Sequence, residues 1–285
     1  MPDTGSAQVE GQSRSERAAR WCRARWAAFL RLPVVRRRAY ALLTCLGLAS
    51  VVYAERLYAQ RRGGFGRVYV EPNAQYDGRF TFVRLRYQVY SQSGWEYDYP
   101  AMERNFMTII NDLSTLHPHV RESNIHDMDD PALARYPIAY LSEPGYWIPD
   151  QPEAEGLRRW IRKGGFLIVD DFFGPQWANF ERSMMAVLPD AKIVRLEVSN
   201  PIFNSFFQLK TLEGMSHPDQ PGRWPAEYYG IYEDNDPNKR LMVVIDYNND
   251  IGDFMEWSGE GWYPVNMSND AYKIATNYII YGMTH

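Results

Sequence analysis

The chain has 285 residues, of which 45% are apolar, 23% charged and 15% aromatic, so it can bury a sizeable core. Its net charge of −4 is the sum over two parts of opposite charge: residues 1–54 hold nine arginines against three acids, whereas residues 55–285 are acidic. An acidic body argues against a nucleic-acid partner. Both cysteines, Cys22 and Cys45, precede this body, which excludes a disulfide framework, cysteine-ligated zinc and a thiol nucleophile there.

The N-terminal segment resembles an export signal. Residues 1–38 form a basic n-region that we expect in the cytoplasm, and residues 39–58 are predicted to be a signal peptide or a signal-anchor transmembrane helix. The apolar run Ala39–Ala54 is shorter than the ~20 residues that cross a bilayer comfortably, so cleavage and retention both stay open. We expect residues 59–78 to be a linker, and residues 79–285 to form one domain on the periplasmic side of the inner membrane.

The first half of the body predicts strands that alternate with helices. Phe80–Tyr87 alternates apolar and basic residues, as a strand does. Residues 101–116 have apolar side chains at helical spacing, and Tyr136–Glu143 is a short apolar run typical of a buried strand.

The next segments continue this alternation. Glu153–Lys163 predicts a helix closed by Gly164, and Phe166–Val169 predicts a buried strand. A further helix should begin at Pro175, and Ala191–Val198 alternates like a strand. Strands that alternate with amphipathic helices indicate a parallel sheet covered on both faces.

The C-terminal part predicts a different arrangement. Tyr228–Tyr232 and Leu241–Tyr247 flank a polar turn and predict a β-hairpin, and Asp270–Tyr281 predicts a closing helix. The expected fold is therefore an α/β three-layer sandwich with a mostly parallel, flavodoxin-like sheet, extended by this hairpin and helix.

Three loops should meet beyond the carboxyl ends of the parallel strands, where open sheets of this kind bind ligands. They are the loop around Trp95, the turn after Tyr136–Glu143 and the turn after Phe166–Val169. Neither a cofactor nor a metal ion is predicted, and no residue is assigned a catalytic role. The candidate ligand-facing residues are Asp98, Tyr99, Glu143, Tyr146, Asp170 and Asp171.

The adjacent acids Asp170 and Asp171 do not form a dyad on a regular strand, because successive side chains point to opposite faces. A shared-proton pair would need Glu143 or Asp98 as the second carboxylate. Alternatively, one aspartate caps N–H groups, for example at the helix that begins near Pro175.

Three other groups of residues could carry chemistry or binding. Asp246, Asn248 and Asp250 alternate like the first three ligands of a calcium loop, but the following residues break that motif, so an acidic turn is expected. His126, His217 and His285 stand in no evident acid–nucleophile context. Four aromatic residues that we expect to be exposed could stack on sugars or on a protein: Trp147, Trp257, Trp262 and Tyr263.

Several of these stretches, FVRLRY, YLSEPGYW and above all GGFLIVDD, resemble a bacterial domain-of-unknown-function family, number 4159, over about Phe80 to Tyr281. The resemblance implies a fold similar to class I glutamine amidotransferases. It also implies an envelope setting, beside MoxR-type ATPases and von Willebrand A domain proteins. In amidotransferases a catalytic cysteine occupies the elbow where this chain has Asp170 and Asp171, so the resemblance extends to fold and not to glutaminase chemistry.

The function expected from the sequence is that of a non-catalytic binding or scaffold module, anchored to the inner membrane or exported, with partners in a MoxR and von Willebrand A type system. The alternative is a hydrolase that depends on a metal ion or on carboxylates and acts on carbohydrate or another small ligand.

Overall fold

The computed structural model of the protein describes residues 69–90 and 94–285. The predicted n-region and the predicted signal or anchor at residues 39–58 lie outside the described residues, as do residues 59–68 of the expected linker. Within the described ranges, no helix is both long and apolar enough to cross a membrane.

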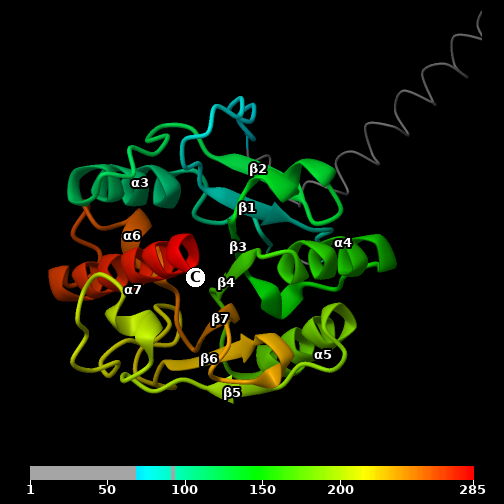
Figure 1. Ribbon diagram of the computed structural model, residues 1–285. Helices are drawn as coiled ribbons and strands as arrows, with labels where there is room; N and C mark the ends of the chain where they lie inside the picture. The colour runs from blue at the N-terminus through cyan, green and yellow to red at the C-terminus, as the bar shows by residue number, and fades with distance from the viewer. Residues whose placement is uncertain (1–68, 91–93) are drawn as a thin grey trace, which may run out of the picture. The chain divides into compact units, whose positions relative to one another are not determined.

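Seven strands form one mixed sheet in the order β2-β1-β3-β4-β7-β6-β5, which runs from top to bottom in Figure 1. The five strands from β2 to β7 are parallel, whereas β6 and β5 are antiparallel to their neighbours. The strands are β1 Val83–Arg86, β2 Asn124–Asp127, β3 Ile138–Ser142, β4 Phe166–Asp170, β5 Ile193–Arg195, β6 Glu227–Tyr232 and β7 Leu241–Tyr247.

Helices cover both faces of the sheet, so the domain is a three-layer α/β sandwich (Figure 1). Helices α4 and α5 lie on one face, and α3, α6 and α7 lie on the other. The helices are α3 Ala101–Leu113, α4 Gln151–Arg162, α5 Trp177–Val187, α6 Ile251–Glu256 and α7 Val265–Thr284.

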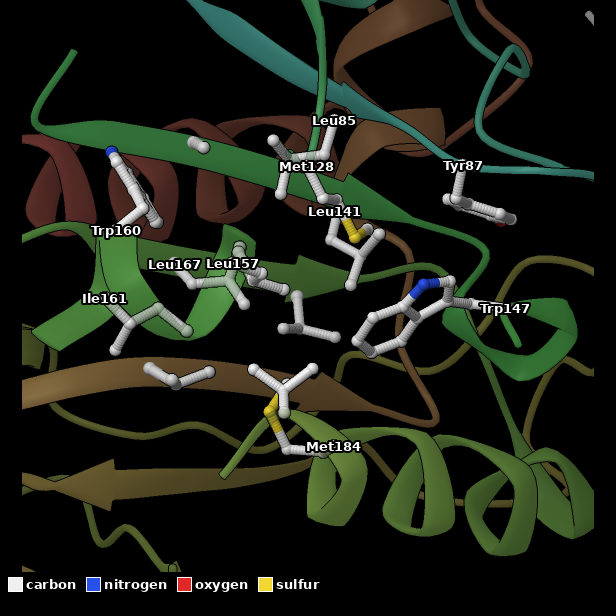
Figure 2. Close-up of a cluster of buried hydrophobic side chains, with 14 of the residues drawn as sticks. Leu85, Tyr87, Met128, Leu141, Trp147, Leu157, Trp160, Ile161, Leu167 and Met184 are labelled. Carbon is white, nitrogen blue, oxygen red and sulfur yellow. The ribbon is translucent and has the colours of Figure 1, made fainter. Parts of the chain in front are cut away.

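The core between the sheet and helices α4 and α5 is built from alternate strand residues (Figure 2). Leu157 and Ile161 of α4 are fully buried against Leu141 and Leu167 of the two central strands, and Met184 of α5 packs beside them. Each such side chain contributes roughly 1.5–3 kcal/mol when it leaves water. Helix α4 begins at a capping box in which Asp150 accepts from the Glu153 N–H, which fixes where the apolar face starts.

The opposite core alternates with the first one along the same strands. Tyr140 and Ile168 point away from α4 and pack with Phe106 of α3, Phe254 of α6 and Tyr278 of α7. The central strands are therefore buried on both faces, as the continuous apolar runs in the sequence predict.

Most predicted elements are present. The strands expected within 80–87, 136–143 and 166–169 correspond to β1, β3 and β4, and the expected hairpin is β6–β7. The strand expected at 191–198 is β5, but it pairs antiparallel with β6 at the edge of the sheet instead of lying beside a parallel strand.

The β2 edge of the sheet is covered by a side chain. The amide of Asn73 donates to the Ile125 carbonyl at 2.9 Å and accepts from the Ile125 N–H at 2.8 Å. The Ala74 N–H donates to the Asn124 side chain at 2.7 Å. The outward-facing backbone groups of Ile125 are therefore already paired.

Candidate functional site

Four residues near the carboxyl ends of β1, β3, β4 and β7 have left-handed backbone conformations although none is glycine. Their φ values are 63° at Asp98, 51° at Glu143, 67° at Asp171 and 58° at Asn248. This conformation costs an L-residue roughly 1–2 kcal/mol, and such residues concentrate at functional sites. Three of the four carry carboxyl groups, so the strand ends form the candidate site.

Asp170 is the last residue of β4, is fully buried and has a structural role. Its carboxylate accepts from the Tyr140 hydroxyl at 2.8 Å and from the N–H groups of Ile251 and Gly252 at 3.2 and 3.0 Å. It therefore caps the first turn of α6. A cap of this kind was one expectation for the helix after Pro175; the cap is present, but on α6.

The Asp171 side chain has different hydrogen-bond partners from those of Asp170. Its Oδ1 accepts from His217 Nε2 at 3.1 Å, and its Oδ2 accepts from the Ser142 hydroxyl at 3.1 Å. Asp250 Oδ2 lies 3.9 Å from the same His217 nitrogen. Asp171, His217 and Asp250 are all buried, and one potential ligand atom from each lies within 4.8 Å of the others.

Both nitrogens of the His217 ring are occupied. The Asp219 N–H donates to Nδ1 at 3.2 Å, so Nδ1 presents its lone pair and Nε2 must carry the proton that is donated to Asp171. The ring also packs edge-on against Phe173 with centroids 4.5 Å apart. In this arrangement His217 holds Asp171 in place and has no lone pair available for a metal ion or for an incoming proton.

A second group lies beside the first. One carboxylate oxygen from each of Asp98, Asp253 and Glu256 lies within 4.8 Å of the others, and all three side chains are partly buried. A methyl group built on Gly252 would lie 2.9 Å from Asp98 Oδ2 and 3.2 Å from Asp250 Oδ1. Because Gly252 borders carboxylates of both groups, the two groups form one acidic site over the start of α6, which we call the strand-end acidic site.

Arg84 lies behind this site and is fully buried. Its Nε donates to Glu103 of α3, and its Nη1 donates to the carbonyls of Trp95 and Tyr97 at 2.9 and 2.7 Å. These bonds fix the loop that ends in Asp98, so Arg84 positions that carboxylate.

Burial and mutual repulsion perturb the carboxyl groups of the site. Burial, followed by the charge of Asp171, raises the pKa of Asp98 and of Asp250 well above the usual range. Burial also raises the pKa of Asp253 and of Glu256. Among the described residues, no lysine or arginine forms an ion pair with these four acids. At longer range, the charge of Arg84 offsets part of this effect for Asp98 and Glu256, and hydrogen bonds from Tyr263 and Trp257 do so for Asp253.

The six sequence-predicted residues separate into two sets. Asp98, Asp170 and Asp171 lie together at the strand ends. Tyr99 is buried, and its hydroxyl accepts from the Glu71 N–H at 3.2 Å. This hydrogen bond joins Tyr99 to the segment that precedes β1 and not to the acidic residues. Glu143 accepts from the Tyr87 hydroxyl through its backbone carbonyl. Tyr146 remains 37% exposed on the neighbouring turn.

Four residues of the site were not among the candidates: His217, Asp250, Asp253 and Glu256. Asp250 and Asp253 stand at the N-cap and N3 positions of α6, and this Asp-x-x-Asp spacing is a helix-start signal that could have revealed the helix. Nothing comparable marks His217, which lies in an irregular loop.

The structure shows where the alternating acidic residues lie, and it overturns one expectation about an aromatic side chain. The alternating residues Asp246, Asn248 and Asp250 do not converge on one point: Asp246 pairs with the Tyr278 hydroxyl, and the Asn248 side chain accepts from the Gly174 N–H. Trp147, expected to be exposed, is completely buried. Trp262 is exposed, as expected.

A cavity of about 510 Å³ opens away from the site, beside β5, β6 and residues 210–215. None of the site's carboxylates lines it. The candidate site therefore rests on its chemistry rather than on the volume of a cleft.

Comparison with known protein families gives a match over most of the body. The family described as Domain of unknown function (DUF4159) matches residues 81–283, which includes every residue of the strand-end acidic site. No curated protein matches the chain.

Proposed function

This chain belongs to the DUF4159 family, and we propose that its body is a non-catalytic binding module whose ligand carries positive charge. The observation that carries the proposal is the convergence of buried and partly buried carboxylates from separate loops. Asp98 follows β1, Asp171 follows β4, and Asp250 and Asp253 follow β7. Such a site stabilises a cation, because each acid is desolvated and repelled by its neighbours until a positive charge arrives.

A binding role is supported further by the state of the imidazole. A general base needs a lone pair directed at the substrate, and both His217 nitrogens are engaged by Asp171 and by the Asp219 N–H. The body also has no cysteine that could act as a nucleophile at the elbow after β4.

The setting of this module is part of the same proposal. The basic leader and the apolar run after it favour an inner-membrane anchor or export to the periplasm. The resemblance to glutamine amidotransferase-like folds, and the envelope partners that it implies, would make the module a sensor or scaffold beside a MoxR and von Willebrand A type system.

The test is a thermal-shift titration of the full-length chain with small cations, using spermidine and CaCl₂ in separate series. We expect at least one of them to raise Tm, since a ligand that binds only the folded state stabilises it. Asp171→Asn should reduce this shift, and Glu181→Gln, which removes an exposed charge on α5, should not. A Tm that no cation raises would refute the proposal.

A second candidate is a hydrolase, favoured by the left-handed conformation of Asp171 at the end of β4 with His217 at 3.1 Å. In this case the Asp171 carboxylate would displace the leaving group of the substrate to form a covalent ester, and water would then hydrolyse that ester and free Asp171. The Ser142 hydroxyl would orient the carboxylate. Hydrolysis of p-nitrophenyl esters or glycosides that disappears in Asp171→Asn and persists in Glu181→Gln would establish this candidate instead.

A further inference from the structure

We propose that the connection between α6 and α7 is a docking surface for an arginine-bearing segment of a protein partner. This connection, residues 257–264, carries Trp257, Trp262 and Tyr263, and we call it the aromatic loop. The inference rests on the proposed function and specifies its ligand, since the positive charge is then a guanidinium group on another protein.

The aromatic loop exposes a large apolar surface. Trp262 is 72% exposed, as is Val265 at the start of α7. The ring centroids of Trp257 and Trp262 lie 5.7 Å apart, with their planes tilted by 55°. A single exposed apolar residue is common, but a contiguous exposed patch marks an interaction site. Tryptophan is also enriched among the residues that dominate the binding energy of protein interfaces.

Hydrogen bonds position two of the three rings. The Trp257 indole N–H donates to Asp253 Oδ1 at 3.3 Å, and the Tyr263 hydroxyl donates to Asp253 Oδ2 at 3.0 Å. The ring of Tyr263 also packs edge-on against Phe254 of α6, with centroids 5.0 Å apart. Because these side chains are ordered before a partner arrives, binding loses little side-chain entropy.

Charge complementarity identifies the occupant. From Leu241 to Tyr272 the sequence has six acids and no lysine, arginine or histidine. Asp253 and Glu256 precede the aromatic loop on α6, and Glu260 lies within it. Within residues 69–90 and 94–285, none of these three acids forms an ion pair with a lysine or arginine. A cationic partner would therefore meet unpaired negative charge beside the exposed rings.

Two further acids act on the same loop from other segments. Burial, followed by the charge of Asp253, raises the pKa of Tyr263, and the charges of Asp250 and Asp219 act in the same direction. Asp219 belongs to the segment before β6. The negative charge around the aromatic loop therefore comes from more than one part of the fold.

Arginine matches both features of this surface. Its planar guanidinium stacks on an aromatic face and donates two parallel hydrogen bonds to a carboxylate. The lysine ammonium is a compact, strongly hydrated charge that has neither property. A neutral sugar would stack on Trp262 but would leave the acids uncompensated.

Fluorescence anisotropy of labelled peptides tests this surface on the full-length chain. One peptide has three arginines separated by glycine and serine, and two matched peptides carry lysine or the neutral citrulline at the same positions. We expect micromolar binding of the arginine peptide, binding weaker by about threefold or more with lysine, and none with citrulline. Chitotetraose, added as a competitor, should not displace the arginine peptide.

Variants then locate the contact. Trp262→Ala should weaken binding of the arginine peptide by about tenfold, and Trp262→Tyr, which keeps an aromatic face, should restore most of it. Glu260→Gln should weaken it by about twofold to fivefold. The controls are Tyr76→Ala, which removes an exposed ring that packs on Tyr136, and Glu181→Gln on α5; both should leave binding unchanged. Because Trp262 is mostly exposed, Trp262→Ala should fold, and an unchanged Tm checks this.

The outcomes separate this inference from the proposed function. The docking surface is overturned if the arginine peptide does not bind, if the citrulline peptide binds equally well, or if chitotetraose displaces the arginine peptide. Equal binding by Trp262→Ala and the natural protein overturns it too. If spermidine still raises Tm in any of these cases, the cation-binding function stands without a protein partner on the aromatic loop. If neither the peptide nor a small cation binds, both proposals fail.

Discussion

Replacement of Arg84 by methionine should destabilise the fold severely. Arg84 and Glu103 are 0% and 1% exposed, and Arg84 also donates to the carbonyls of Trp95 and Tyr97. Arg84→Met fills a similar volume but leaves the Glu103 charge buried without a partner. Breaking such a pair costs about 3–5 kcal/mol, so we expect a loss of about 4 kcal/mol, or roughly a thousandfold in the unfolding equilibrium.

Urea unfolding of the full-length chain, followed by tryptophan fluorescence, measures this loss. The double variant Arg84→Met with Glu103→Leu should recover most of it, because the uncompensated charge is then absent. Arg104→Met is the matched control: Arg104 pairs with Glu71 at the surface and should cost at most about 1 kcal/mol. If Arg84→Met lowers the free energy of unfolding by no more than Arg104→Met does, the prediction is wrong.

Two more predictions concern other parts of the fold. Gly252→Ala would place a methyl group 2.9 Å from Asp98 Oδ2 and from the Tyr140 hydroxyl, so we expect a loss of about 1–3 kcal/mol in urea unfolding. The same change at Gly259, which has open space around it, should be nearly neutral, and equal effects would contradict the prediction. Burial raises the pKa of Glu153 from 4.5 to about 7. Between these two pH values the folded state binds more protons than the unfolded state, so the free energy of unfolding falls as pH rises from 4.5 to about 7. Tm measured from pH 4.5 to 8 should fall less in Glu153→Gln than in the natural protein, and parallel curves would refute this.

The central strands were predictable because their burial on both faces leaves a continuous apolar run. In β4, Phe166–Asp170, every residue is buried. By contrast, β2 has the sequence Asn-Ile-His-Asp with a single large apolar residue, Ile125. A short edge strand of this kind is stabilised by its partner and by the Asn73 side chain rather than by its own pattern, so no periodicity reveals it.

The acidic site was predictable only in part. The rule that ligands bind at strand ends selected Asp98, Asp170 and Asp171, which the structure places close together. It could not include His217, because the loop that carries this residue has no periodicity and is positioned by a backbone bond from the His217 N–H to the Asn248 carbonyl. It also missed Glu256, since α6 has only six residues and its helical pattern is too short to recognise.

The pairing of Asn73 with Ile125 bears on how copies of this protein coexist. A bare sheet edge is a template on which another chain can add a strand, and proteins avoid self-association by shortening or covering such edges. Here one edge is occupied by the Asn73 amide, and the other edge strand, β5, has only three residues. Crowded copies of the domain should therefore resist edge-to-edge aggregation. An extended peptide should likewise find little backbone to pair with, so recognition would depend on side chains and loops.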